Sequence, residues 1–167
     1  EFANERVRRY YDAAPRHIEM ALQISFGVNR DMSEEPQALT WFLPEPVTIV
    51  DRDLDRIDIE VYNFDDTLAP EGKTGVKVML SAGYDYWRGL LEAGRGKYDD
   101  EKQRVAALVL GLLERRFPGI SAQVEMTDVA TPVTTERFPG NWRWLQAWCV
   151  PGEPFAIFRG LTRNLPG

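Results

Sequence analysis

Four segments between residues 22 and 80 alternate apolar with polar side chains, and this period of two constrains the fold more than any other feature. Such a period is typical of a strand that buries one face and exposes the other. Polar, turn-forming residues 63–73 connect the last two segments. The apolar residues of the four predicted strands are Leu22, Ile24, Phe26 and Val28, then Leu39, Trp41 and Leu43, then Ile57, Ile59 and Val61, and finally Val76, Val78 and Leu80.

After these strands the pattern changes to a helical period. Apolar residues spaced by three and four positions run from Val105 to Leu113 and form one face of a helix. Asp99 or Asp100 is the predicted N-cap of this helix, and Pro118-Gly119 ends it. The second half of the chain therefore supplies an amphipathic helix that can cover one face of a sheet.

Three further elements complete the predicted order. A short helix is expected over residues 84–91 and a polar helix over residues 4–13. One more strand is expected to carry Ile120, Ala122, Val124 and Met126 on a single face. Helices and strands do not alternate one by one, so we predict an α+β fold. Its sheet is mixed and mostly antiparallel with helices packed on one side, in a single domain over residues 1–167.

Charge and composition narrow the range of partners. The formal net charge is -6, which repels phosphate backbones and anionic lipid, so neither nucleic acid nor an acidic membrane surface is expected as a partner. No apolar run reaches the roughly 18 residues of a membrane span, so no transmembrane segment is predicted. Cys149, the single cysteine, is expected to be a small buried hydrophobe. A cytoplasmic location follows as the simplest prediction, with a parent protein peripheral to a membrane left open.

Two stretches imitate phosphate-binding loops and fail on spacing. Gly72-Lys73-Thr74 ends like a P-loop, but Thr67 stands where that loop needs a glycine. Gly94-Arg95-Gly96 opens like a dinucleotide fingerprint, but Asp99 stands at the third glycine position and no strand precedes it.

The sequence also offers no convincing metal site and no convincing catalytic nucleophile. Asp51, Asp53 and Asp55 have the opening spacing of a calcium loop, yet Arg56 replaces its glycine, so a solvated turn is the expected structure. His17 is the only histidine and suits a capping or surface role. We therefore predict no metal site and no catalytic residue, and a chain that is not catalytically competent alone.

Three blocks of sequence, in this order, resemble one family. The first block is residues 62–73, which read YNFDDTLAPEGK. The second combines residues 84–87, 98–102 and 116–120, and the third combines residues 128–134 and 136–142. Together they are similar to the phytoene desaturase and carotenoid isomerase-like flavoproteins, which belong to the wider amine-oxidase-type FAD fold.

The resemblance implies a role for the chain. It corresponds to the substrate-binding domain of an FAD-dependent oxidoreductase, lying between an N-terminal dinucleotide fingerprint and a C-terminal flavin segment. The expected partners are the flavin-binding domain of the same polypeptide and an apolar small-molecule substrate. FAD is expected in the full-length parent and none on this chain, which reads as a fragment. The reaction of the parent, whether desaturation, isomerisation or another, stays open.

Site residues are carried over from the third block. Thr131-Pro132 has two interpretations that remain equal. One is a strand-to-helix corner beside the flavin, with Arg137 anchoring it to the other domain. The other is a helix start with Thr as the cap and Pro in the first position. The residues expected near substrate or flavin are Thr131, Pro132, Thr134, Arg137, Gly140, Asn141, Trp142 and Trp144.

Large side chains raise two further questions. Trp142, Trp144 and Trp148 either line a pocket or form a surface that another domain covers. Trp144 stands where the family places small residues, so the pocket is expected to be narrower than one for a long carotenoid. The apolar strand residues are expected to be core, with a chamber wall as the alternative, and these are Phe26, Val28, Trp41, Ile59 and Val61.

Two competing functions remain open. The chain can be a stand-alone module that binds an apolar ligand or a protein through its tryptophans, because it lacks catalytic residues. It can also be a family member that keeps the fold but has changed its chemistry, as Trp144 suggests.

Overall fold

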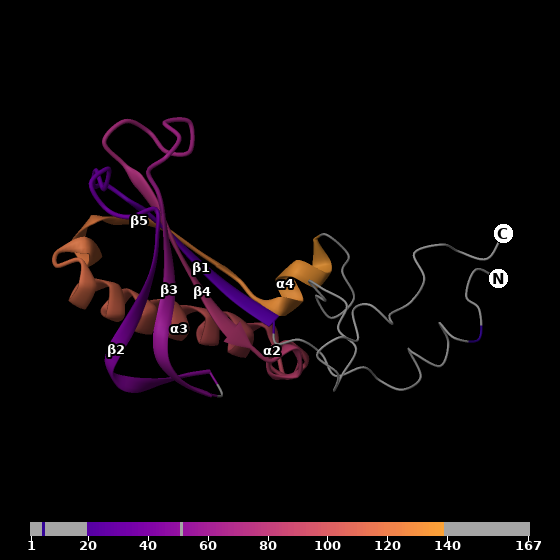
Figure 1. Cartoon of the computed structure of the whole chain (residues 1–167). Helices are drawn as coiled ribbons and strands as arrows, with labels where there is room; N and C mark the ends of the chain where they lie inside the picture. The colour runs from indigo at the N-terminus through magenta and orange to yellow at the C-terminus, as the bar shows by residue number, and fades with distance from the viewer. Residues whose placement is uncertain (1–4, 6–19, 51, 139–167) are drawn as a thin grey trace. The chain divides into compact units, whose positions relative to one another are not determined.

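The computed structural model describes residue 5, residues 20–50 and residues 52–138. The described residues 20–50 and 52–138 belong to one compact unit, which contains every element named here. The helix expected over residues 4–13 lies outside the described residues. In chain order (Figure 1), the elements are β1 (Met20–Val28), β2 (Ala38–Ile49), β3 (Arg52–Tyr62), β4 (Thr74–Ala82), α2 (Tyr84–Glu92), α3 (Arg95–Arg116), the 3-10 turn η1 (Ile120–Gln123), β5 (Val124–Ala130) and α4 (Pro132–Arg137).

The five strands form one open sheet in the order β2-β3-β4-β1-β5, and each neighbouring pair is antiparallel. This confirms the α+β class and the four alternating strands, and the sheet is antiparallel throughout. β2 extends beyond its predicted run to Ile49. Its pairing with β3 shifts register between Phe42 and Val47, where Pro44 and Pro46 stand. Proline is tolerated there because β2 is an edge strand with a bulge.

The strand residues with a period of two meet on one face. One continuous row crosses the sheet in register from Leu39 through Ile59, Val78 and Ile24 to Val129. Burying such a row contributes the main favourable term of folding. The predicted core residues belong to the same cluster: Phe26, Val28, Ile59 and Val61 are buried and Trp41 is half-buried against them. They therefore belong to the core of the domain.

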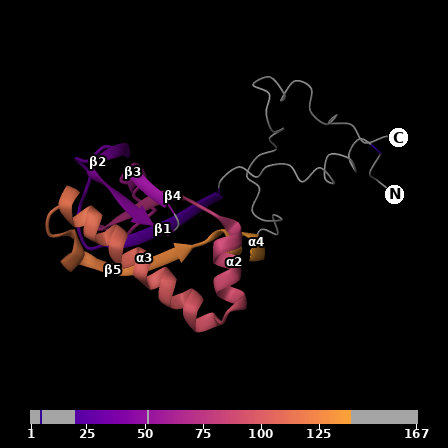
Figure 2. The ribbon, with the colours of Figure 1, turned by 90° about the horizontal axis from the view of Figure 1, so that it is seen from below.

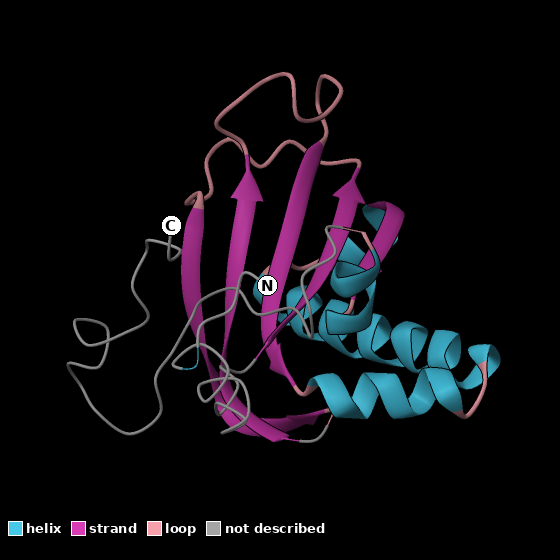
Figure 3. Ribbon diagram, turned by 90° about the vertical axis from the view of Figure 1, so that its right-hand side faces the viewer, coloured by secondary structure: helices cyan, strands magenta, loops and turns pink. Residues whose placement is uncertain are grey.

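Helix α3 covers this face of the sheet. Its buried residues Val105, Val109 and Leu113 are fully enclosed and fall on one helical stripe. Figures 2 and 3 show α2 and α3 on the same side of the sheet. No described helix lies on the other side. We call that side the open face, and its central residues are Gln23, Ser25, Gly27, Gly75, Lys77, Met79, Asp58, Glu60 and Tyr62.

The predicted start of α3 is wrong by one turn. The helix begins at Arg95, not after Asp99 or Asp100, and Gly94 precedes it with a φ of 133° that favours glycine. Arg95 Nε lies 2.8 Å from Asp99 Oδ2, an i,i+4 pair on the first turn. The extra turn brings Tyr98 into the core, where it is 3% exposed. Gly94 is therefore the N-cap residue of α3.

The strand predicted to begin at Ile120 is also wrong. Residues 120–123 form a 3-10 turn, and the strand begins at Val124. Gly119 adopts φ 86°, and the Glu114 carboxylate accepts hydrogen bonds from the backbone N–H groups of Ser121 and Gly119 at 2.8 and 2.6 Å. These bonds hold the pKa of Glu114 below its ordinary value. Met126 is consequently on the open face and 69% exposed.

The row across the sheet gives a stability prediction. We expect Ile24→Ala to lower the free energy of unfolding by about 2–5 kcal/mol and Ile24→Val by about 0.5–1.5 kcal/mol, because each leaves a cavity in the core. Ser25→Ala, on the open face of the same strand, should change it by less than about 0.5 kcal/mol. Urea denaturation of the parent chain and the three variants measures these free energies of unfolding. Equal losses of stability for Ile24→Ala and Ser25→Ala would contradict the assignment of the two faces of β1.

Candidate functional site

The third sequence block forms a strand-to-helix corner. β5 ends at Ala130, and Thr131 then acts as the N-cap of α4 with Pro132 in the first helical turn. The Thr131 Oγ1 accepts a hydrogen bond from the Thr134 backbone N–H at 3.2 Å. Proline suits this position because its missing N–H would have no partner there. The helix-start interpretation of Thr131-Pro132 is therefore confirmed, whereas proximity to a flavin stays a prediction.

Tyr98 joins this corner to helix α3. Its hydroxyl lies 2.6 Å from Thr131 Oγ1 and 3.1 Å from Thr134 Oγ1. Thr131 is fully buried and Tyr98 nearly so. Buried hydroxyls must be satisfied by hydrogen bonds, and these three satisfy one another. We call Tyr98, Thr131 and Thr134 the hydroxyl triad.

Aromatic rings of α2 pack against Tyr98, a member of the hydroxyl triad. Trp87 is fully buried, and its ring meets that of Tyr98 edge-on at a centroid distance of 5.8 Å. Tyr86 contacts Trp87 edge-on at 5.6 Å. The Trp87 Nε1 has no hydrogen-bond partner among the described residues. Such edge contacts stabilise aromatic pairs beyond the area they bury. Residues 84–87 and 98–102 of the second block therefore form one packed corner with residues 131–134 of the third.

Polar contacts surround the corner at its solvent side. The Tyr86 hydroxyl donates to Glu101 Oε1 at 2.8 Å, and Arg104 Nε donates to Glu101 Oε2 at 2.7 Å. The hydrogen bond from Arg104 holds the pKa of Glu101 below its ordinary value, with burial opposing it and Tyr86 assisting. The Tyr84 hydroxyl donates to Glu136 across α2 and α4. The Glu101 carboxylate is therefore held in its ionised form and does not resemble a proton-transfer group.

The predicted site residues divide into two sets. Thr131, Pro132 and Thr134 come together at the corner. Arg137 is exposed at the end of α4, with its guanidinium 5.6 Å from the Phe138 ring centroid. Gly140, Asn141, Trp142 and Trp144 lie outside the described residues, as do His17, Trp148 and Cys149.

Sequence reasoning did not include Tyr98 or Trp87 among the site residues. The signal for Tyr98 is its helical spacing: seven residues before Val105, it lies on the buried stripe of α3 once the helix starts at Arg95. Its contact with Thr131 joins two distant segments, which no local pattern reveals.

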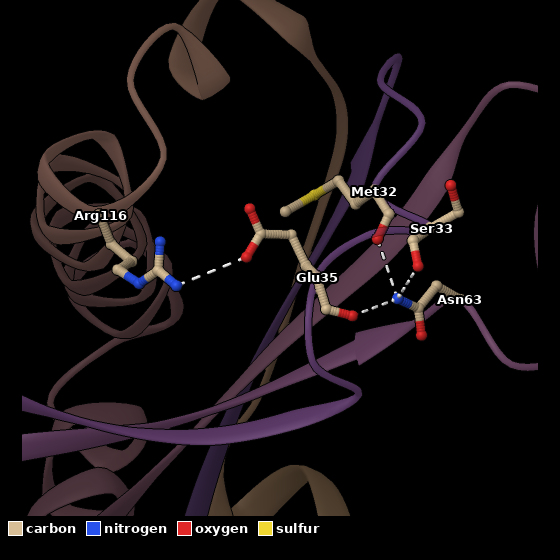
Figure 4. A network of polar contacts seen from close by, with 5 residues as sticks. All are labelled: Met32, Ser33, Glu35, Asn63 and Arg116. Atoms are coloured by element: carbon tan, nitrogen blue, oxygen red, sulfur yellow. Dashed lines mark hydrogen bonds and ion pairs between the residues drawn. The ribbon is translucent and has the colours of Figure 1, made fainter.

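The first sequence block forms the connection at the other end of β4. Its Asn63 Nδ2 donates to the carbonyl oxygens of Met32 at 2.8 Å and Glu35 at 2.7 Å (Figure 4). The Thr74 hydroxyl donates to the Arg30 carbonyl at 2.9 Å. In the loop itself, the Asp65 carboxylate accepts from the hydroxyl and backbone N–H of Thr67, which lowers the pKa of Asp65. This block therefore fastens the two loops at this end of the sheet.

Two surface hollows lie away from the corner. One of about 490 Å³ lies beside the loop at residues 63–73 and is lined mainly by polar residues, among them Asp31, Asp65 and Lys73. The other, about 540 Å³, lies between α3 and β5, with Phe26, Ala106 and Val129 among its lining residues. Within residues 20–50 and 52–138, no three His, Cys, Asp or Glu side chains gather as metal ligands. None of the described helices is both long and apolar enough to span a bilayer.

The hydroxyl triad gives a second prediction. Thr131→Ala should lower the free energy of unfolding by about 0.5–2 kcal/mol because a helix cap is lost. Tyr98→Phe should cost about 0.5–1.5 kcal/mol through one buried hydrogen bond. Thermal or urea unfolding of the two single variants and the double variant forms a double-mutant cycle. The free energy of unfolding lost in the double variant should be smaller than the sum of the losses in the two single variants. Thr131→Ser is the matched control and should stay close to the parent, while strictly additive losses would contradict the shared network.

Comparison with known proteins finds a similarity over part of the chain. A chloroplastic prolycopene isomerase from Arabidopsis thaliana is 33% identical over 75 residues, which is 44% of this chain. A chloroplastic prolycopene isomerase from an Oncidium hybrid cultivar is also 33% identical, and one from Daucus carota is 29% identical, over the same length. The matched segment is only 12% of the length of these relatives. No protein-family model matches the chain.

Proposed function

We propose that this chain is the substrate-side domain of a flavin-dependent oxidoreductase or isomerase related to the prolycopene isomerases. The observation that carries the proposal is the 33% identity over 75 residues with the Arabidopsis thaliana enzyme. The resemblance of three ordered sequence blocks to carotenoid isomerase-like flavoproteins agrees with it. We include the whole chain, residues 1–167, in this domain.

The positions of the two ends of the described body support an inserted domain. Met20 pairs with Ala82 at the end of the sheet next to α2, and β5 reaches the same end where Ala130 pairs with Gln23. The chain therefore enters β1 and leaves α4 at one end of the sheet. Termini that lie close together are typical of domains inserted into a longer chain. The corner of α2, α3 and α4 is next to this junction, which suits a role beside a second domain.

The described residues do not themselves fit an FAD site. Gly94-Arg95-Gly96 lies between helices α2 and α3, whereas a dinucleotide fingerprint follows a strand and wraps a pyrophosphate with its glycines. We therefore assign FAD to the flavin-binding domain of the parent polypeptide, where it would supply the redox chemistry. The contribution of this chain is to shape the substrate chamber and exclude water from it.

The proposed substrate is an apolar small molecule, because the relatives are named as prolycopene isomerases. Trp144 stands where the family places small residues. The proposal therefore includes substrates shorter than a full carotenoid. A cytoplasmic location also remains part of the proposal, although the relatives are chloroplastic by name.

One observation favours a second candidate, a stand-alone module that binds an apolar ligand or a protein. Several large apolar side chains of the described body are exposed, and these are Phe42, Phe64, Leu68, Met126 and Phe138. Exposed apolar surface of this kind often marks an interaction site. Phe138, at 76% exposure, lies beside Arg137 at the junction end, which equally fits contact with another domain of the same polypeptide.

Flavin content decides between these two candidates. The complete reading frame around these residues should encode a strand, a G-x-G-x-x-G turn and a helix upstream. Its purified product should be yellow and release FAD on denaturation, measured by absorbance and fluorescence of the supernatant. The 167-residue chain, purified in parallel, should be colourless. A complete frame without the fingerprint, or a product without flavin, would remove the flavoprotein proposal in favour of the stand-alone module.

Arg137 provides a test at single-residue level. In the isolated chain, Arg137→Ala should change the free energy of unfolding by less than about 0.5 kcal/mol, because the side chain is exposed. In the complete protein it should reduce flavin retention or turnover, because the guanidinium would anchor the neighbouring domain. Arg115→Ala, an exposed arginine at the end of α3, is the matched control and should leave both unchanged. Equal behaviour of the two variants in the complete protein would contradict the anchoring role.

A further inference from the structure

Strand β5 forms one edge of the sheet, and no described strand pairs with its outer side. It pairs with β1 on its inner side, and the strand order of the sheet ends with it. Along such an edge, the backbone N–H and C=O groups that point away from the sheet lack a partner strand. These groups are therefore available to pair with an added strand.

The two edges of the sheet differ in their protection against such pairing. The other edge strand, β2, carries Pro44 and Pro46 at a shift of register between Phe42 and Val47. Prolines and bulges are devices by which natural proteins prevent pairing at an exposed edge. Residues 124–130 contain no proline, and residues 126–130 pair with β1 without a break. The β5 edge is thus the one open to a further strand.

A hollow of about 540 Å³ lies beside this edge, between α3 and β5. Phe26, Ala106 and Val129 are buried residues of its lining, and Leu110 of α3 is half-buried beside them. Thr127 is in register with Phe26 on the same face and is exposed. Helix α3 therefore leaves part of the apolar face of the sheet uncovered next to β5.

A free edge beside an apolar hollow favours an extended peptide as the occupant. In recognition by strand addition, main-chain hydrogen bonds give affinity and pockets beside the strand receive every second side chain. A strand added to β5 would direct alternate side chains to the face of Thr127 and Val129, and thus toward the hollow. These side chains must be apolar to match the lining.

The charge of the edge selects the residues on the other face of the added strand. Asp128 is exposed on the open face and takes part in no ion pair or side-chain hydrogen bond within residues 20–50 and 52–138. Opposite charges across two strands stabilise their pairing, and like charges destabilise it. A basic residue opposite Asp128 is therefore favoured. A second copy of β5 does not supply one, because residues 124–130 include Glu125 and Asp128 but no lysine or arginine.

The position of the hollow favours the parent polypeptide as the source of this strand. Asp99 and Lys102 line the hollow in the first turns of α3, beside the corner where Tyr98 meets Thr131. This is the end of the sheet at which the chain enters β1 and leaves α4. The matched segment is 12% of the length of the relatives. A parent of their size has a long additional chain that would meet the described body at this end.

We propose that the outer edge of β5, together with the hollow between α3 and β5, binds an extended segment of the parent polypeptide from outside residues 1–167. The segment has apolar side chains at alternate positions, facing the hollow, and a basic residue opposite Asp128. The inference rests on the proposed function for the existence of the parent. It adds to that function the place at which the rest of the polypeptide is joined to this sheet.

A synthetic peptide tests the edge on the 167-residue chain. The probe is the capped heptapeptide RVTVTVR, whose valines occupy alternate positions. We expect it to bind and to slow amide hydrogen exchange in residues 124–130, while exchange in the other edge strand, residues 38–49, stays unchanged. The matched peptide EVTVTVE should bind about tenfold more weakly, because its acidic residues face Asp128.

Three variants separate peptide binding from stability. Ala107 is exposed and lines the hollow, so Ala107→Trp should fill it and weaken binding of RVTVTVR about tenfold without lowering the urea midpoint. Ala122→Trp, at an exposed position outside the hollow, is the matched control and should leave binding unchanged. Asp128→Asn should remove the preference for RVTVTVR over EVTVTVE.

The complete protein tests the source of the strand. Amide hydrogen exchange in residues 124–130 should be about tenfold slower or more in the complete protein than in the 167-residue chain, because the edge is occupied. RVTVTVR should also fail to bind the complete protein.

Several outcomes would overturn the inference. These are no binding of RVTVTVR by the 167-residue chain, protection of residues 38–49 equal to that of residues 124–130, and equal exchange of residues 124–130 in the two proteins. Self-association of the 167-residue chain through residues 124–130, measured by analytical ultracentrifugation and hydrogen exchange, would assign the edge to a second copy and also overturn it.

Flavin content distinguishes failure of this inference from failure of the proposed function. A complete protein that holds flavin but exchanges residues 124–130 as fast as the 167-residue chain contradicts the inference alone. A complete protein that lacks flavin but protects residues 124–130 contradicts the proposed function alone.

Discussion

The structure depends on one-sided burial of its sheet. Ile24 and Val78 are fully enclosed at the centre of a row that crosses all five strands, and Val109 and Leu113 of α3 are enclosed on the helix that covers it. Removing this apolar surface from water is the main favourable term in folding. The described helices cover one face of the sheet, and no described helix covers the other.

The corner at the end of this layer is held by hydrogen bonds as well as by packing. The Thr131 hydroxyl accepts from the Thr134 N–H and contacts the Tyr98 hydroxyl, so one buried oxygen caps a helix and ties it to α3. A buried hydroxyl without partners would be costly, and this mutual satisfaction fixes the direction in which α4 leaves the sheet. Arg137 and Phe138 are the last two described residues, and both are exposed.

The open face has a different character from the buried one. Its charges are arranged in pairs, such as Lys77 with Glu60, in which the hydrogen bond from Lys77 lowers the pKa of Glu60 against the opposing effect of burial. The row of Gly27 and Gly75 lies next to Lys77 and Glu60 on this face, at the end of the sheet beside the loop of residues 63–73.

The sequence by itself determined which residues face the core of β1, β3 and β4, because alternation is a local property of a few neighbouring residues. For Thr131-Pro132 it left two interpretations equal, and the structure decided for the helix start. It placed the start of α3 and the buried face of β5 wrongly, since Gly94 and Glu114 act through backbone conformation and capping that the apolar pattern does not record. Only the tertiary structure decided that β1 lies between β4 and β5, that Tyr98 meets Thr131, and that Gly27 lies beside Gly75. The physical reason is that strand order and register between distant segments are set by cross-strand pairing and packing of the whole core.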